Sequence, residues 1–252
     1  MTLSLDFSGQ HVWVTGAGQG IGYRTALTFA EAGAVVVGLD LRFAENDYPF
    51  RTQLLDITDA GQVERVCRDL FTEQSQLDVL VNGAGILRMG ATDSLALADW
   101  QDCLAVNAGG AFNVFRHTLP VFRAQRAGAI VSIASNAAHV PRLGMSAYCA
   151  SKAALRSLCL TVGLEMAPFG VRCNLVSPGS TDTPMQRALW QTDQAEQRTI
   201  AGFPDQFKLG IPLGKIGRAQ EVADAILFLA SRHASHITMQ DIVIDGGATL
   251  AA

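Results

Sequence analysis

The stretch His11-Val-Trp-Val-Thr-Gly-Ala-Gly-Gln-Gly-Ile-Gly22 decides the fold of this chain. Its first five residues predict a short apolar strand, and the glycines that follow predict a tight turn. A helical pattern of apolar residues then runs to Gly33, and the continuous apolar run 34–40 is typical of a parallel strand buried on both faces. The stretch therefore predicts a strand, helix and parallel strand at the start of an α/β fold.

Strands and helices alternate through most of the remaining chain. Strands are expected at 53–56, 78–81, 129–133, 171–176 and 241–244, and helices near 60–72, 99–125, 148–167 and 219–231. This alternation predicts one Rossmann-like, doubly wound parallel sheet of about seven strands with helices on both faces. Because no linker, repeat or low-complexity tract divides the chain, we expect residues 1–252 to form a single domain.

Residues from about 181 to 216 interrupt the alternation. They contain three prolines and several glycines, with one helical piece expected at 185–201. A long insertion after the carboxyl end of a strand is well placed to act as a substrate lid. An ordinary surface excursion explains the composition equally well.

Composition excludes several classes of protein. At 252 residues, of which 49% are hydrophobic, the chain can bury a sizeable core. Its net charge of −4 gives no basic footprint for nucleic acid. Five scattered cysteines are typical of reduced thiols, so we expect neither a disulfide framework nor a metal site. The N-terminal residues lack the features of a secretion signal, and no apolar run is long enough for a membrane span. We expect a cytoplasmic protein without a membrane partner.

The glycine-rich turn predicts a dinucleotide site. Glycines at positions 16, 20 and 22 let the backbone approach a pyrophosphate at the start of the following helix. Asp40 ends the second strand, where a carboxylate accepts hydrogen bonds from a ribose 2′-hydroxyl and repels a 2′-phosphate. This favours NAD over NADP, although Arg42 lies near enough to soften the preference. The alternative role for Asp40 is to cap the loop.

Tyr148 and Lys152 are four residues apart in a predicted helix, so they share one face. An ammonium beside a phenol favours the phenolate, and the lowered pKa would let Tyr148 act as a general base. Ser135, after an apolar strand, supplies a hydroxyl for the reacting oxygen. Alone, the Tyr148 and Lys152 spacing also fits an exposed contact or a packed ring.

Two further polar features stand near the predicted site. The segment Asn82-Gly-Ala-Gly85 follows a strand, where small residues would let a cofactor cross the sheet edge, or form a plain turn. Asn107 lies inside a predicted helix although Asn is a poor helix former, which suggests a polar task, or an amide that fills a kink.

Taken together, these motifs resemble the short-chain dehydrogenase/reductase family in order and spacing, over essentially the whole chain. The matching positions are Thr15 to Gly22, Asn82 to Gly85, Asn107, Ser135, Tyr148 with Lys152, and Pro178-Gly179. One departure is Gly83, where the family usually has a second Asn. The resemblance implies that Tyr148 is the base, Lys152 lowers its pKa and binds the nicotinamide ribose, Ser135 holds the substrate oxygen, and Asn107 anchors a relay water.

The expected cofactor is NAD. The residues expected to bind it are Thr15, Gly16, Gly18, Gln19, Gly20, Ile21, Gly22, Asp40, Leu41, Asp56, Ile57, Asn82, Gly83, Ala84, Tyr148, Lys152, Pro178, Gly179, Thr181 and Thr183.

A finer resemblance concerns one branch of the family, which oxidises a cyclohexadiene diol carboxylate to a catechol acid in siderophore biosynthesis. It rests on four segments: 85–93, 145–148, 177–183 and 207–216. It implies a small-molecule substrate whose carboxylate needs a cation, for which Arg88 and Arg142 are the candidates. With Ser135, Met145 and Met185, these complete the expected substrate contacts.

Several alternatives remain open. Another NAD-linked alcohol dehydrogenase or a 3-oxoacyl reductase of the same family would carry the same motifs, and so, in part, would a non-catalytic NAD-binding module. The resemblance implies a homotetramer built on the helices near 99–125 and 148–167. A contact with the adenylating enzyme that acts next in such a pathway is left open by the sequence.

Overall fold

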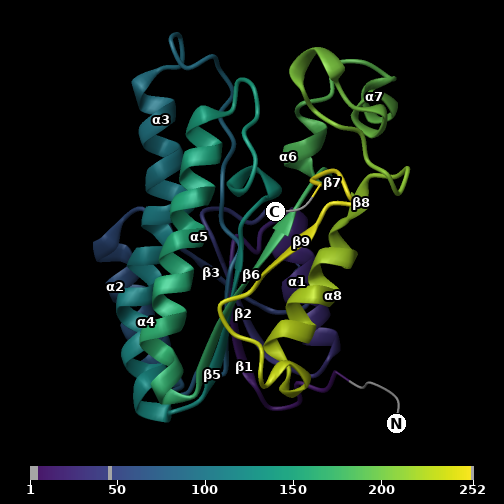
Figure 1. The fold of residues 1–252 in the computed structure, drawn as a ribbon. Coiled ribbons are helices and arrows are strands. Elements are labelled where there is room, and N and C mark those ends of the chain that lie inside the picture. The colour runs from purple at the N-terminus through teal and green to yellow at the C-terminus, as the bar shows by residue number, and fades with distance from the viewer. Residues whose placement is uncertain (1–4, 45–46, 251–252) are drawn as a thin grey trace.

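The computed structural model describes residues 5–44 and 47–250. Its main sheet has seven strands in the order β3-β2-β1-β4-β5-β6-β9, and every neighbouring pair is parallel (Figure 1). The strands are β1 (His11–Thr15), β2 (Val35–Asp40), β3 (Arg51–Leu54), β4 (Val79–Asn82), β5 (Gly128–Ile133), β6 (Val171–Pro178) and β9 (Asp241–Ile244). This confirms the predicted doubly wound parallel sheet. The strand order reverses between β1 and β4, where such folds form a crevice.

Helices cover both faces of the sheet (Figure 1). The larger ones are α1 (Gly20–Glu31) and α8 (Ala219–Ala230) on one face, and α2 (Ala60–Glu73), α4 (Ala111–Gln125) and α5 (Ser146–Met166) on the other. Alternation along β1 explains why two cores form: Val12 and Val14 pack toward α1 and α8, whereas Trp13 packs toward the opposite helices. Because both faces are buried, the central strands are mostly apolar, and their few buried polar residues include Ser132 and Asn174.

The strand predicted at 53–56 lies two residues earlier in the structure, at β3. Its register pairs Val37 with Arg51 and Asp40 with Leu54. The prediction was displaced because the Asp56 side chain accepts hydrogen bonds from both the amide and the hydroxyl of Thr58, which starts the turn before α2. The strand therefore ends before Asp56.

The single helix predicted at 99–125 is interrupted. It consists of α3 (Leu97–Leu104), a π-helical turn over Ala105–Gly110, and α4. Asn107 lies in this π turn and is 1% exposed. π turns are uncommon and cluster at functional sites. The π turn therefore suggests that the backbone departs from α-helical geometry here in order to position Asn107.

The helical piece predicted at 185–201 was wrong as one element. The structure has α6 (Pro184–Arg187) and α7 (Ala195–Ala201), with irregular backbone between them. The amide of Ala195 donates to the carbonyl of Thr192, so Thr192 and Asp193 form a turn, in keeping with their low helix propensity. The two ends of the segment are joined by a small parallel sheet of β7 (Thr181–Asp182) and β8 (Gly217–Arg218).

The other short elements are 3₁₀ turns: Asn136–Ala138, Ala167–Phe169, Pro204–Gln206 and Arg232–Ala234. In the described ranges, none of the helices has the length and apolar character that crossing a membrane requires.

Candidate active site

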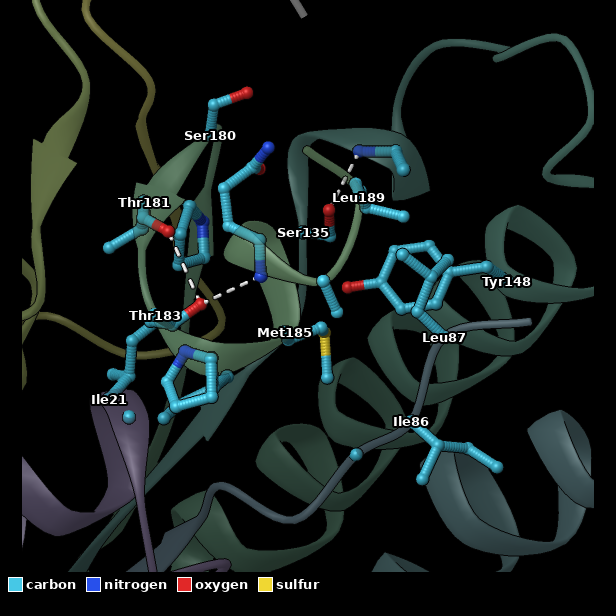
Figure 2. Close-up of a pocket in the computed structure, with 18 of the residues that line it drawn as sticks. Ile21, Ile86, Leu87, Ser135, Tyr148, Ser180, Thr181, Thr183, Met185 and Leu189 are labelled. Carbon is cyan, nitrogen blue, oxygen red and sulfur yellow. Dashed lines mark hydrogen bonds between the residues drawn. The ribbon is translucent and has the colours of Figure 1, made fainter. Parts of the chain in front are cut away.

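A cavity of about 920 Å³ opens at the carboxyl ends of the strands. One wall is the glycine-rich turn between β1 and α1, and the other walls come from the ends of β4, β5 and β6, the start of α5, and segment 181–216. Figure 2 shows how Thr183 and Met185 of that segment face Ser135 and Tyr148 across this space. The cavity thus joins the predicted cofactor turn to the predicted reacting groups.

Most of the predicted site residues line this cavity. They are Gly16, Gln19, Gly20, Ile21, Gly22, Asp40, Leu41, Asp56, Ile57, Gly83, Ala84, Ser135, Arg142, Met145, Tyr148, Lys152, Pro178, Gly179, Thr181, Thr183 and Met185. The structure places Thr15, Gly18, Asn82, Arg88 and Asn107 outside the lining.

The glycine-rich turn forms a cradle that side chains would fill. Gly16 has a φ of +72°, and a Cβ there would lie 2.6 Å from the amide nitrogen of Ala84. A Cβ on Gly22 would lie 2.0 Å from the carbonyl oxygen of Gly16. Helix α1 has no side-chain cap and no acidic residue in its first turn, so its leading N–H groups remain available to an anion. These features fit the pyrophosphate of a dinucleotide.

Asp40 has a structural role in this turn. Its carboxylate accepts hydrogen bonds from the amides of Gly18 at 2.8 Å and Arg42 at 3.2 Å. Asp40 also lines the cavity, so the loop-capping role and the ribose-binding role predicted for it are compatible.

Thr15 and Asn82 support the site from behind. The Thr15 hydroxyl accepts hydrogen bonds from the amides of Gly83 and Ala84, and the Asn82 amide donates to Ser132. A Cβ on Gly83 would lie 2.7 Å from the carbonyl oxygen of Thr15, so the Gly that departs from the family pattern lets β1 and the end of β4 approach closely.

Ser135, Tyr148 and Lys152 meet at the catalytic end of the cavity. The Ser135 hydroxyl accepts a hydrogen bond from the amide of Ala137 and is hydrogen-bonded to the Tyr148 hydroxyl. In Figure 2 the Tyr148 hydroxyl points into the cavity on the side of Ser135. Lys152 is 4% exposed, donates to the carbonyl of Ile133 at 2.8 Å, and lies 5.8 Å from the centroid of the Tyr148 ring.

The expected lowering of the Tyr148 pKa is not found in this structure. Burial raises the pKa of Tyr148 to about 12, and the hydrogen bond with Ser135 only partly opposes this rise. Burial also lowers the pKa of Lys152 to about 8, so its ammonium is itself destabilised, and its proton is directed at the Ile133 carbonyl. The two side chains are four residues apart on α5, as predicted, but desolvation is the largest cause of the pKa shift of each.

Replacing Lys152 with Met is expected to change how stability depends on pH. Between the lowered folded-state pKa of about 8 and the ordinary 10.5, the unfolded chain retains a proton that the folded protein has released. Relative to the Met variant, wild-type protein should therefore gain about 2 kcal/mol in free energy of unfolding between about pH 7.5 and 9.5.

Urea unfolding of both proteins at the two pH values measures this gain. The comparison cancels the opposing contribution of buried thiols such as Cys67, whose pKa burial raises to about 12 and which therefore costs stability as pH rises. If the free energy of unfolding changed by the same amount between the two pH values in the Met variant and the wild type, Lys152 would not be a buried titrating group.

Asn107 does not present its side chain to the cavity. Its carbonyl oxygen accepts from the amide of Ile86 at 2.8 Å, and its amide group donates to the Ile86 carbonyl and to Ser151. A Cβ on Gly85 would lie 3.2 Å from both the Asn107 oxygen and the Lys152 ammonium, so these two polar groups flank the same point of the chain. The Asn107 side chain therefore clamps the segment after β4, and its expected role of anchoring a relay water stays a prediction.

Arg88 is placed away from the predicted substrate. Its guanidinium lies 3.0 Å from a carboxylate oxygen of Asp99 and 3.6 Å from one of Asp102, both on α3. These acids hold the side chain against the helix and outside the cavity lining, so the structure does not bring Arg88 to the site expected for the substrate carboxylate. Arg142, the other candidate, lines the cavity.

Several residues at the site were missed by sequence reasoning. Arg198, Phe203 and Lys208, all from segment 181–216, line the cavity. Lys208 lies in segment 207–216, one of the four segments on which the finer resemblance rests. That resemblance was the signal in the sequence that could have pointed to Lys208. His139 points elsewhere and binds Asp241 at 2.9 Å.

A family model described as enoyl-(acyl carrier protein) reductase matches residues 16–249. With the glycine-rich turn, Ser135, Tyr148 and Lys152 around one cavity, this match decides the family. The chain belongs to the short-chain dehydrogenase/reductase family. Like other members of the short-chain dehydrogenase/reductase family, it is an oxidoreductase that acts on a small molecule, and the family typically uses a nicotinamide cofactor.

Three relatives illustrate where the chain stands in the short-chain dehydrogenase/reductase family. It is 66% identical over 248 residues to 2,3-dihydro-2,3-dihydroxybenzoate dehydrogenase of Escherichia coli (strain K12), covering 98% of this chain and 100% of that one. It is 40% identical to the enzyme of the same name from Bacillus subtilis (strain 168), covering 96% and 97%. The ligand-free structure of Thermoplasma acidophilum aldohexose dehydrogenase superposes with a TM-score of 0.87 at 32% identity, covering 97% and 96%.

Proposed function

We propose that this protein oxidises 2,3-dihydro-2,3-dihydroxybenzoate to 2,3-dihydroxybenzoate with NAD, in the biosynthesis of a catecholate siderophore. The observation that carries the proposal is the 66% identity, over the full length of the relative, to a dehydrogenase of that name. The cavity supports it with a hydroxyl pair and a buried lysine at one end and a glycine cradle at the other.

The protein groups divide the chemistry between them. Ser135 positions the C3 hydroxyl of the substrate, and Tyr148 accepts its proton as the general base. A bound oxidised nicotinamide would supply the acceptor for the hydride lost from C3 and a positive charge in the cavity. Lys152 adds a second positive charge beside Tyr148. The charges of the nicotinamide and Lys152 both oppose the rise that burial imposes on the pKa of Tyr148. The ketone that forms tautomerises to the aromatic acid, which draws the reaction forward.

The cofactor would lie along the glycine-rich turn, with its pyrophosphate at the start of α1 and its adenosine ribose beside Asp40. A carboxylate at position 40 supports a preference for NAD, since it repels the 2′-phosphate of NADP. The preference should be moderated by Arg42, which also lines the cavity.

Asp40→Asn is expected to shift the cofactor preference toward NADP by about tenfold or more in kcat/KM, because it removes the charge and keeps a hydrogen-bond acceptor. Steady-state rates with each cofactor measure the shift. Asp69→Asn, an exposed carboxylate on α2, controls for net charge and should leave the ratio unchanged. An unchanged ratio in the Asp40 variant would mean that another group reads the ribose.

The proposed function is tested by following NADH absorbance with purified protein and the dihydrodiol acid. Simple secondary alcohols and acetoacetyl thioesters serve as rival substrates for an alcohol dehydrogenase and a 3-oxoacyl reductase. The expected result is a kcat/KM for the dihydrodiol acid at least about a hundredfold higher than for either rival. No turnover of the acid, with turnover of a thioester, would transfer the assignment to the reductase.

We also propose that residues 1–252 act as a single cytoplasmic domain with 181–216 as the lid, and that the protein assembles as a homotetramer. Phe112 on α4 and Leu164 on α5 are 49% and 67% exposed, which supports an interface on these helices. A contact with the adenylating enzyme of the next step would require this assembly to leave the cavity mouth accessible.

A further inference from the structure

We propose that Arg142 and Lys208 together bind the substrate carboxylate, with Arg142 reaching from the loop before α5 and Lys208 from the lid segment. The carboxylate would thereby bridge the catalytic loop and the lid. This inference rests on the proposed function and specifies how that site selects an acid.

Both cations face the cavity without an acidic partner. They line its wall, and among the described residues no carboxylate forms an ion pair with either of them. Against the lowering by burial, Cys149 and, after it, Asp245 raise the pKa of Arg142, and the Asp245 carboxylate already accepts hydrogen bonds from the Asn136 side chain and the amide of Gly247. Arg142 and Lys208 are therefore cations at the cavity wall with which none of the described carboxylates forms an ion pair.

The two cations are close enough to repel each other. Burial lowers the pKa of Lys208, and the charge of Arg142 lowers it further. Burial also lowers the pKa of Arg142. Two partly desolvated like charges that line one cavity are an unfavourable arrangement that a bound anion relieves.

The position of these cations separates them from the cofactor end. Among the described residues that line the cavity, the acids are Asp40, which accepts a hydrogen bond from Gly18 of the glycine-rich turn, and Asp56, which follows β3. Arg142 follows Ser135 and precedes Tyr148 in the chain, and it lines the same cavity as both. The catalytic end is thus positive, whereas the ribose end carries the carboxylates.

The lid holds Lys208 in place through Phe203. These two residues exchange backbone hydrogen bonds of 2.8 and 3.1 Å, around a 3₁₀ turn at Pro204–Gln206. The turn closes with Phe207 in the left-handed conformation at a φ of +53°. The Lys208 ammonium lies 5.4 Å from the centroid of the Phe203 ring, and Arg198 lies over the same ring at 5.5 Å. The aromatic ring orients the lysine without neutralising it, so its charge remains available to a ligand.

The test compares an acid with a neutral analogue. Lys208→Gln and Arg142→Gln are assayed with the dihydrodiol acid and with its primary amide, at saturating NAD. Loss of a charge-assisted hydrogen bond should lower kcat/KM for the acid about 10- to 100-fold, mainly through KM, and change that for the amide less than about threefold. Lys215→Gln is the matched control, because Lys215 belongs to the same segment but pairs with Glu221 outside the cavity.

Each outcome has one meaning. Equal losses on acid and amide in either variant would show that the residue supports the lid and does not read the carboxylate, and no loss on the acid would also overturn the proposal. If wild-type protein does not oxidise the acid, the proposed function fails. Equilibrium dialysis of the NAD-loaded protein with 2,3-dihydroxybenzoate and with catechol then decides the inference, which requires tighter binding of the acid and loss of that preference in the Lys208 variant.

Discussion

Tyr148→Phe lowers kcat for oxidation of the dihydrodiol acid by about a thousandfold, within the range that general-base catalysis contributes, and leaves NADH binding within a few-fold of wild type. The phenylalanine ring keeps the packing of α5 but has no hydroxyl to accept the proton. The hydrogen bond with Ser135 is lost as well. Because the effect falls on proton transfer, kcat should fall and the affinity for cofactor should not.

Single-turnover kinetics and fluorescence titration with NADH measure the two parts of this prediction. Tyr23→Phe is a suitable control, since Tyr23 is a half-buried tyrosine on α1 that packs edge-on to Tyr48 and lies outside the cavity lining. A Tyr148 variant that kept a tenth of wild-type activity would remove this residue from the role of base. It would mean that another group accepts the proton.

Gly22→Ala is expected to abolish useful cofactor binding and to destabilise the protein. The added Cβ would lie 2.0 Å from the carbonyl oxygen of Gly16 and 2.7 Å from its carbonyl carbon. Both are backbone atoms, so relief requires α1 to move away from the turn that cradles the pyrophosphate. Overpacking of this kind costs about 1–3 kcal/mol of stability, and the displaced turn should weaken NADH binding at least about a hundredfold.

Urea unfolding and NADH titration separate these effects. Gly61→Ala is the matched control, because Gly61 is an exposed helical glycine in α2 whose added Cβ would meet its nearest neighbours, the Arg65 and Asp59 side chains, at 3.4 Å. That control should gain up to about 1 kcal/mol of stability and bind NADH normally. If the Gly22 variant binds NADH as tightly as wild type, the helix start does not form the pyrophosphate site.

Local patterns were sufficient for the architecture. Apolar runs such as 34–40 and 129–133 predicted buried parallel strands, and the structure confirms both, because a strand covered on two faces is apolar at most positions. The predicted boundaries of strands were less accurate where a side-chain hydrogen bond ends the strand. The strand β3 ends before Asp56 because the Asp56 side chain binds Thr58. The pattern of apolar residues gives no sign of this hydrogen bonding.

The π turn at Ala105–Gly110 shows a further limit of local patterns. Its sequence is compatible with continuous helix, and the backbone departs from that geometry where Asn107 binds Ile86, a residue far away in the chain. The lid segment also differs from the single helix that was predicted for it. The pairing of β7 with β8 fixes the ends of this segment, and that pairing does not require one continuous helix between them.

The sequence by itself determined the order of strands and helices, the glycine turn and the spacing of Tyr148 and Lys152, because these follow from periodicity and from residues near one another in the chain. Only the tertiary structure decided that Arg88 is held by Asp99 while Arg142 and Lys208 face one cavity. It also decided that burial raises the pKa of Tyr148. Ion pairing and desolvation depend on which distant segments pack together, and no local pattern specifies that.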